Sequence, residues 1–362
     1  MRNNDRLRIH VVHVGHGDCI LIEMPDLVDD GVRRVRFGMV DAGGMDADVK
    51  DKPLGYLMAF LECRIGSGWT PDDFIFEFLC LTHPHEDHYK GMLTLLRGLE
   101  DRDPHCLPLE FWDSGFRYNT ARYLNVLEYL YTHRAIQFVR VTSGTEFHYG
   151  EAEVMVLAPS VDMRNRYDTY GVDLNDASIV LRIRHGKGVA ILSGDAHFDA
   201  WGKICEEFPR KKHLIYPPVT VHGQLKPDKR DPNHEDLVLE SREDQLKCQL
   251  LKVAHHGSKN GTSYEYLDKL DPLHFAIPCD DDTWYQSSTR TRSWTGKFPH
   301  PVTRLAIGEQ AGFYSASSSQ IPAADANRRR VGLTSLEGTM IYTITSGGTV
   351  RRNDLCLSLI HI

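Results

Sequence analysis

Three histidines and two acidic residues occupy the six positions from His83 to His88, within the segment THPHEDHYKGM. The stretch FEFLCL before them is apolar and predicts a β-strand, and YKGMLTLLRGL after them has the spacing of a helix. The segment therefore forms a strand-to-helix loop, where side chains can converge on one point. We expect this loop to be a functional site.

The spacing His-x-His-x-Asp-His suits a metal site. His83 and His85 project the same way from an extended segment, and Asp87 and His88 follow at the turn. Imidazole nitrogens suit zinc or manganese, and a carboxylate can hold a second ion beside the first. The alternative is a histidine-rich surface loop. With 19 histidines in 362 residues, chance would produce this pattern in only about a few of every thousand chains.

Strand-like and helix-like segments alternate along the chain, which predicts a mixed α/β fold with sheet layers covered by helices. Residues 208–247 are charged, contain prolines and have weak periodicity, so we expect an insertion or long loop there. Helices are predicted at 53–65, 89–99, 120–135, 198–208 and 263–270. Strands are predicted within 7–24, 33–44, 73–81, 136–144, 148–160, 177–196, 248–258, 274–280 and 304–310, and a hairpin plus strand from 338.

Composition indicates in which compartment the protein works and what it contacts. The N-terminal MRNNDRLRIH is polar, and no apolar run approaches the roughly 20 residues of a membrane helix. The eight cysteines are scattered without a Cys-x-x-Cys pair, which favours reduced thiols and a cytoplasmic protein that contacts no membrane. The net charge of -8 weighs against non-specific wrapping of nucleic acid, although bound divalent ions would add local positive charge.

Further metal ligands are expected at the ends of other predicted strands. The strand in GVAILSGDAH delivers Asp195 at its tip, where a carboxylate can bridge two cations or simply form a turn. LLKVAHHGS ends in His255 and His256, and two histidines at a strand tip favour ligation. Asp18 in VVHVGHGDC and Asp41 in MVDAGG are better suited to orienting ligand histidines through their second ring nitrogens.

The order of these motifs resembles the metallo-β-lactamase fold. VGHGDCILIE, VDAGG, THPHEDHYKGM, NDASIVLRI, ILSGDA, LKVAHHGS and FPHPVTRL follow one another over roughly residues 7–310. The likeness is greatest to the ComEC-type branch, named for the nuclease-like domain of a DNA-uptake protein. It implies a four-layer αβ/βα sandwich of residues 1–310, completed by strands from 311–362. It also implies metal-assisted hydrolysis of phosphodiesters, lactams, lactones or thioesters.

The resemblance assigns roles to the ligands of two divalent ions, Zn²⁺ or Mn²⁺. His83 and His85 match the ligands of the first ion, and Asp87 and His88 those of the second. Asp195 matches the carboxylate that bridges the two ions. Two ions held in this way activate a water molecule, which Asp87 or Asp195 would orient.

Two parts of the family pattern are less regular here. Either His255 or His256 matches the last ligand of the second ion, and we favour His255. The third histidine of the first ion is absent, and NDAS stands at that point. Asn175, Asp176 or Ser178 would therefore complete or border the first site.

Two further histidines are candidates for proton transfer or ligation. The family's Gly-Gln-Gly-Asp is Gly-His-Gly-Asp here, so His16 is a candidate extra ligand or acid. His300 matches a late His-Pro element and would contact the substrate or give the leaving group a proton, unless it is only a turn residue.

The segment SSTRTRSWTGKFPHP adds basic and aromatic residues close to this last motif. Guanidinium groups and stacking surfaces suit a phosphodiester and its bases, and a solvated basic loop is the alternative. The basic candidates for substrate contacts are Arg290, Arg292 and Lys297, and the aromatic residues are Trp284, Tyr285 and Trp294.

Three functions follow from these observations. The first is a metal-dependent phosphodiesterase, most simply a nuclease that cleaves DNA. The second is a hydrolase of the same fold for a small ester, lactone, lactam or nucleotide phosphodiester, which the acidic net charge favours. The third is an interaction module with a vestigial site, which the absent third histidine favours. The 208–247 insertion would serve as a contact for a protein partner or for a second copy of the chain.

Overall fold

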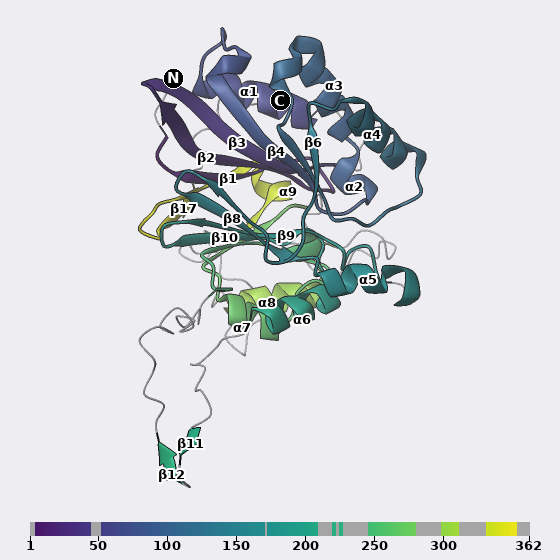
Figure 1. Cartoon of the computed structure of the whole chain (residues 1–362), viewed down its shortest axis with the longest axis vertical. Helices are drawn as coiled ribbons and strands as arrows, with labels where there is room; N and C mark the ends of the chain where they lie inside the picture. The colour runs from purple at the N-terminus through teal and green to yellow at the C-terminus, as the bar shows by residue number, and fades with distance from the viewer. Residues whose placement is uncertain are drawn as a thin grey trace.

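The computed structural model of the chain is shown in Figure 1. It describes residues 4–44, 52–170, 172–208, 219–221, 224–226, 245–279, 298–310 and 331–352. Of the 208–247 segment it therefore describes Phe208, residues 245–247 and a short two-stranded ribbon of β11 (Val219–Val221) and β12 (Gln224–Lys226). No helix of the described residues is long and apolar enough to cross a membrane.

Two mixed sheets form the centre of the molecule. The first has eight strands in the order β17-β16-β1-β2-β3-β4-β5-β6, and the second has seven in the order β15-β14-β13-β10-β9-β8-β7. The strands of the first sheet are β1 (Leu7–Val11), β2 (Cys19–Asp29), β3 (Val32–Ala42), β4 (Phe74–Leu81), β5 (Glu110–Asp113), β6 (Gln137–Arg140), β16 (Met340–Ile344) and β17 (Val350–Arg352). Those of the second are β7 (Glu146–Tyr149), β8 (Ala152–Ala158), β9 (Val180–His185), β10 (Gly188–Leu192), β13 (Leu250–Lys252), β14 (His274–Ile277) and β15 (Val331–Leu333).

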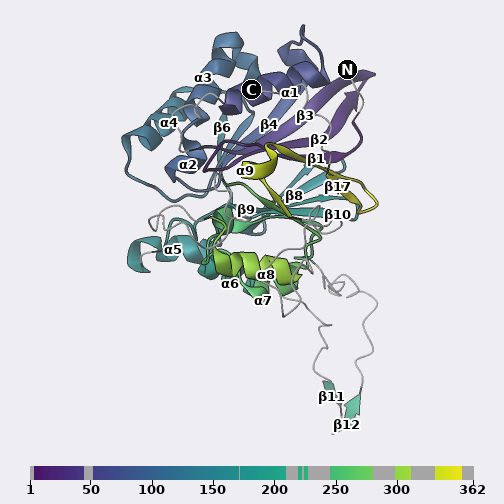
Figure 2. The same cartoon turned by 180° about the vertical axis from the view of Figure 1, so that it is seen from behind.

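Helices cover the outer face of each sheet, as Figures 1 and 2 show from opposite sides. Over the first sheet lie α1 (Lys52–Arg64), α3 (Met92–Arg102) and α4 (Ala121–Thr132), and over the second lie α5 (Val161–Tyr170), α6 (Phe198–Glu207), α7 (Tyr264–Leu270) and α8 (Pro301–Gln310). The short α2 (Glu86–Tyr89) and α9 (Thr334–Glu337) lie in connections. The four-layer αβ/βα sandwich that the motif resemblance implied is therefore confirmed.

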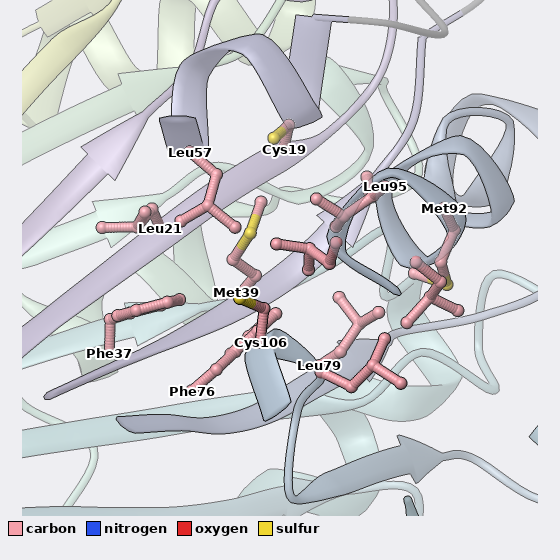
Figure 3. Close-up of a cluster of buried hydrophobic side chains, with 14 of the residues drawn as sticks. Cys19, Leu21, Phe37, Met39, Leu57, Phe76, Leu79, Met92, Leu95 and Cys106 are labelled. Atoms are coloured by element: carbon pink, nitrogen blue, oxygen red, sulfur yellow. The ribbon is translucent and has the colours of Figure 1, made fainter. Parts of the chain in front are cut away.

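Three apolar cores hold the layers together. Figure 3 shows part of the core between the first sheet and its helices, where Leu57 of α1 and Leu95 of α3 meet Leu21, Met39 and other strand residues. A second core joins the other sheet to α6, α7 and α8. The third lies between the sheets and includes the stacked rings of Phe78 and Trp112. Strand β4 and the first six residues of β2 are mainly apolar because both of their faces are buried in these cores.

The topology brings the polar strand ends together. Strands β3, β4, β5 and β6 are parallel to one another, and so are β10, β13, β14 and β15. The carboxyl ends of parallel strands meet at one edge of a sheet, which is where open α/β sheets bind ligands. Backbone hydrogen bonds join the two edges, for example from Ile179 N to Thr82 O at 2.9 Å.

One predicted element is wrong. The segment 304–310 was expected to be a strand, but it lies within α8. Three adjacent apolar residues in RLAIGEQ fit either a short strand or a helix. The helix buries Thr303, Ala306, Ile307 and Gly308. Leu305 is 51% exposed, which a strand buried on both faces would not permit. Pro301 at the first helical position favours the helix that forms.

Candidate metal centre

The histidine-rich loop lies between β4 and α2, as the sequence predicted. His83 follows the end of β4, His85 precedes the first turn of α2, and Asp87 and His88 lie within that turn. The turn packs against the loop that follows β3. A Cβ atom on Gly43 would lie 1.7 Å from Asp87 O, so residue 43 must be glycine for these two loops to meet.

Four side chains from three separate segments form a compact cluster. The ligand atoms of Asp87, His88, Asp195 and His256 all lie within 4.8 Å of one another. Asp195 Oδ2 is 3.2 Å from His88 Nε2 and 3.8 Å from His256 Nε2. Asp87 Oδ2 is 3.2 Å from His256 Nε2 and 3.8 Å from His88 Nε2. We call these four residues the compact cluster.

The second ring nitrogens of the two histidines face acceptors deeper in the protein. His256 Nδ1 is 2.8 Å from Pro278 O, and His88 Nδ1 is 2.7 Å from Asp41 Oδ2. Because a carbonyl oxygen only accepts, His256 Nδ1 must carry a proton, so in the neutral ring the lone pair of Nε2 is directed into the cluster. Asp41 is fixed in turn by the N–H and hydroxyl of Thr82, each 2.8 Å from a carboxylate oxygen. Such contacts set the orientation and basicity of metal-binding histidines.

The residues of the compact cluster fit a divalent cation. Among the described residues, His88 Nε2 and Asp195 Oδ1 are buried without a hydrogen-bond partner. Imidazole nitrogens combined with carboxylate oxygens suit zinc, manganese or iron. An ion at this place would satisfy His88 Nε2 and would neutralise carboxylates that are otherwise buried close together.

Lysine at position 252 is a component of the site that sequence reasoning missed. Its side chain is fully buried, and Nζ forms an ion pair with Asp18 Oδ2, donates to Gly194 O at 2.7 Å and lies 3.7 Å from Asp195 Oδ1. Burial would lower the pKa of Lys252, but the charges of Asp18 and Asp195 raise it. The only signal in the sequence is a lysine inside the apolar run LLKVA. A charged residue in a strand buried on both faces needs a buried partner.

The turn after β13 is strained. His255 and His256 have φ angles of 48° and 52°, and Gly257 follows with a φ of 83°. Non-glycine residues rarely adopt this left-handed conformation, which costs about 1–2 kcal/mol per residue. The turn directs the two imidazole rings differently, with their planes at 73°. His255 Nε2 lies 3.7 Å from Asp195 Oδ2, and His255 Nδ1 lies 2.6 Å from His197 Nε2.

His83 and His85 form a separate pair beside the compact cluster. His83 Nε2 and His85 Nδ1 are 2.9 Å apart. His83 Nδ1 is 3.3 Å from the hydroxyl of Ser178, which also accepts a 3.0 Å hydrogen bond from Asp195 N. The ring of Tyr118 lies 5.8 Å from that of His85. The two nitrogens that point at each other are suitably placed for a shared ion.

The remaining residues that the sequence suggested for the site make contacts of their own or lie outside the described residues. Asp176 Oδ1 accepts a hydrogen bond from Ala200 N in the first turn of α6, and Asn175 N donates to Asp173 Oδ1. His16 Nε2 lies 3.6 Å from Asp87 Oδ2, and His300 N donates to Gly257 O at 2.8 Å. Arg290, Arg292 and Lys297, together with Trp284, Tyr285 and Trp294, lie outside the described residues.

Electrostatics divides the histidines into two groups. Burial would lower the pKa of His88 and of His256, but nearby carboxylates, Asp195 first among them, raise both. Burial lowers the pKa of His255 to about 4, and together with the charge of His88 it lowers that of His83 well below the usual value. Burial would raise the pKa of Asp195, yet the surrounding histidines hold it well below its usual value.

Comparisons with known proteins concern the fold. No family model and no curated protein sequence matches the chain. Among solved structures, the metallo-beta-lactamase fold protein YhfI from Bacillus subtilis aligns over 96% of this chain and 100% of its own, with 10% identity and a TM-score of 0.44. Yeast PDE1 aligns over 85% of this chain and 93% of its own (10% identity, TM-score 0.40). A long form RNase Z from yeast aligns over 85% of this chain but only 44% of its own (13% identity, TM-score 0.40).

Proposed function

We propose that this chain is a metal-dependent hydrolase, and that its substrates are phosphodiesters, most simply DNA. The compact cluster carries the proposal, because its two carboxylates and two imidazoles converge from three separate segments. Divalent ions in such a site lower the pKa of a water molecule and polarise a phosphoryl oxygen. Asp87, His88, Asp195 and His256 would hold one ion, and His83 and His85 would contribute to a second.

The chain's own groups would direct the attack. Asp87 Oδ2 lies beside His256 and His16, at 3.2 and 3.6 Å, at the less buried side of the cluster. This carboxylate is placed to accept a proton from the attacking water and to fix its direction. As the new phosphorus–oxygen bond forms, the bond to the leaving oxygen breaks, and that oxygen takes a proton from His300 or His16.

The rim of the site favours an anionic substrate with a flat group. Lys259 is exposed beside the histidine turn, and its charge reaches His300, whose pKa is lowered by burial and by that charge. Phe298 stacks on His255 at 5.6 Å, and the ring of Tyr118, which is 43% exposed, lies 5.8 Å from that of His85. A cation can pair with the phosphate groups of a nucleic acid, and the two aromatic rings can stack on its bases. The motif resemblance to the ComEC-type branch is the reason for naming DNA.

The decisive test is cleavage of plasmid and single-stranded DNA after chelation, with Mn²⁺, Mg²⁺ or Zn²⁺ added back singly. We expect ion-dependent cleavage by the wild type and at least a 10³-fold loss in Asp87→Asn. Asp101→Asn, which changes an exposed carboxylate on α3, is the matched control and should cleave normally. Cleavage without added ion, or equal cleavage by Asp87→Asn, would refute the proposal.

A small-molecule hydrolase is the second candidate, and the net charge of -8 favours it because a long polyanion would be repelled. Bis(4-nitrophenyl) phosphate and a chromogenic lactone, tested with the same ions and variants, separate the two candidates. Turnover of a small substrate without DNA cleavage would replace the nuclease. Bound metal without turnover of any substrate would favour an interaction module.

A further inference from the structure

A cavity outside the metal centre lies between α4 and the edge strand β6 of the first sheet. Its volume is about 300 Å³, at the lower end of the range for pockets that hold small ligands. The polar and aromatic residues of its lining are Asp113 at the end of β5, Arg117 in the loop that follows, Tyr123 and Tyr131 of α4, and Phe138 and Arg140 of β6. None of these six residues belongs to the candidate metal centre.

The apolar wall of the cavity follows from the spacing along α4. Tyr123, Leu127 and Tyr131 recur every four residues, so they lie on one face of the helix. Tyr123 is buried, but Tyr131 is 80% exposed, and Phe138 on β6 is 42% exposed. The ring of Phe138 stacks on that of Phe111 in the core, with centroids 5.7 Å apart. Large exposed apolar groups around a cavity are a feature of ligand-binding sites.

Two arginines border the cavity on its solvent side. The side chain of Arg140 is 53% exposed, and Arg117 is exposed on the loop after β5. Arg140 Nε lies 3.8 Å from Asp113 Oδ2. A guanidinium group carries five N–H donors, so Arg140 retains donors for a phosphate group of a ligand.

A buried carboxyl group lies at the inner end of the cavity. The side chain of Asp113 is 7% exposed, and its Oδ2 accepts a hydrogen bond from Gly115 N at 2.9 Å. Burial raises the pKa of Asp113, whereas this hydrogen bond and the charges of three arginines, Arg140 first among them, lower it. Because the two oxygens of a carboxylate can accept about four hydrogen bonds, Asp113 can also accept N–H groups of a ligand.

The strand order places this cavity beside the histidine-rich loop. Leu81, where β4 ends before that loop, pairs with Asp113, and Asp113 pairs with Arg140. Neighbouring strands are about 4.8 Å apart, so the backbone of Arg140 lies about 10 Å from that of Leu81. On the loop after β5, the ring of Tyr118 lies 5.8 Å from that of His85, and the residue before Tyr118 lines the cavity. The cavity and the metal centre therefore lie along the same edge of the sheet.

We propose that this cavity binds a nucleotide. The base lies against the rings of Tyr131 and Phe138, with an N–H edge toward Asp113. The phosphate pairs with Arg140 and Arg117. Guanine matches the carboxylate best, because its Watson–Crick edge presents two neighbouring N–H donors. The nucleotide is either free or one unit of a single strand whose next phosphodiester reaches the metal centre, and only the second case rests on the proposed function.

The test is ligand binding to the metal-free, full-length chain, which does not depend on cleavage. Isothermal titration calorimetry in EDTA measures the affinities of guanosine monophosphate, guanosine and inorganic phosphate. We expect one guanosine monophosphate per chain, bound at least about 10-fold more tightly than guanosine or phosphate, because it uses both the guanidinium groups and the aromatic wall.

Five variants make the result specific. Arg140→Gln should weaken guanosine monophosphate about 10-fold and leave guanosine unchanged. Tyr131→Ser should weaken both ligands by about 5-fold or more. Asp113→Asn should also weaken both, because its amide replaces an acceptor by a donor, and thermal unfolding checks that this variant is folded. Arg97→Gln on α3 and Tyr264→Ser on α7 are the matched controls, since both residues are exposed outside the cavity, and they should bind like the wild type.

A guanine-containing single-stranded DNA oligonucleotide separates the two sources of the nucleotide. Fluorescence anisotropy in EDTA measures its affinity for the wild type and for Arg140→Gln. An oligonucleotide that binds through Arg140 and is displaced by guanosine monophosphate assigns the cavity to a unit of the strand. Guanosine monophosphate that the oligonucleotide does not displace assigns it to a free nucleotide.

Three results would overturn the proposal. The first is that neither guanosine monophosphate nor the oligonucleotide shows saturable binding. The second is that inorganic phosphate binds as tightly as guanosine monophosphate, which would indicate an anion site without a base. The third is that Arg140→Gln and Tyr131→Ser bind both ligands like the wild type. Nucleotide binding in EDTA without DNA cleavage by any ion-loaded protein would refute the nuclease and leave the nucleotide site intact.

Discussion

Two buried groups of charged residues lie close to β2, and they differ in their balance of charge. At one, Arg64 contacts Glu23 Oε1 at 2.5 Å and Asp26 Oδ1 at 2.8 Å, and Arg8 contacts Glu23 Oε1 at 2.9 Å. We call these four residues the balanced cluster, because both carboxylates are paired with guanidinium groups; Arg33 Nη1 also reaches Asp26 Oδ2 at 3.3 Å. The other, the carboxylate cluster, has four carboxylates, Asp18, Asp41, Asp87 and Asp195, and among the described residues Lys252 is the one lysine or arginine paired with them.

The difference separates a structural cluster from a binding site. Buried charges are tolerated when they are paired and hydrogen-bonded, as Glu23 and Asp26 are. In the carboxylate cluster Lys252 pairs with Asp18, and the excess negative charge is offset only by histidines whose pKa values are raised. A site with surplus carboxylates and ligand atoms that lack hydrogen-bond partners could hold cations from solution. The following experiments test that contrast.

The largest effect is expected from removing the one lysine of the carboxylate cluster. Lys252→Met leaves Asp18 buried beside other carboxylates, and breaking a buried pair in this way costs about 3–5 kcal/mol. Urea unfolding of the metal-free protein measures the loss. Lys247→Met is the matched control, because Lys247 is 44% exposed and its pair with Asp271 is worth about 1 kcal/mol at most. Equal stability of the two variants would contradict the structural role of Lys252.

The balanced cluster should contribute to the acid sensitivity of the fold. Burial would raise the pKa of Glu23, but the hydrogen bond and charge of His10, with Arg8 and Arg64, lower it from 4.5 to about 2. Because the folded pKa is the lower one, the stabilisation is complete above about pH 4.5 and is lost as the pH falls to about 2. It amounts to about 3 kcal/mol. Urea unfolding of Glu23→Gln should show a correspondingly flatter pH dependence, and parallel curves would contradict the assignment.

Divalent ions should stabilise the protein only through the carboxylate cluster. A ligand that binds the folded chain at 100 times its dissociation constant adds about 2.7 kcal/mol. Thermal unfolding with and without Mn²⁺ should show this gain in the wild type and in Glu23→Gln. In Asp87→Asn most of the gain should disappear. A rise of equal size in all three proteins would indicate that the ions act elsewhere.

The smallest effect is expected from Asp41, which contacts the second ring nitrogen of His88 and is not itself part of the compact cluster. Asp41→Asn keeps the shape of the side chain and tolerates the φ of 57° at this position, but it removes the carboxylate that orients His88. Ion affinity should fall about 10–100-fold, or about 1.4–2.8 kcal/mol. Equilibrium dialysis with Mn²⁺ measures it, with Asp101→Asn as the unaffected comparison. An unchanged affinity would show that Asp41 supports the fold and not the ligand.

Much of the fold could be predicted because local signals agreed with global ones. The apolar run of β4 and the histidine loop after it occur where the pattern placed them. The error at 304–310 arose because Leu305, Ala306 and Ile307 fit two periodicities, and only packing against the second sheet selected the helix. Similarly, Asp195 was recognised at a strand tip, whereas His197, two residues further on, carried no pattern of its own.

The sequence by itself determined the chemical character of the site. Ligand-type residues at the ends of apolar strands can be recognised without knowing the distances between their side chains or the directions in which those side chains point. Tertiary structure decided which of them meet. The positions of the His255 and His256 rings depend on two left-handed φ angles. The burial of Lys252 depends on Asp18, in the loop that precedes β2 of the other sheet. Contacts between residues far apart in sequence are fixed by packing and by the path of the chain. Neither can be read from the sequence around the residues involved.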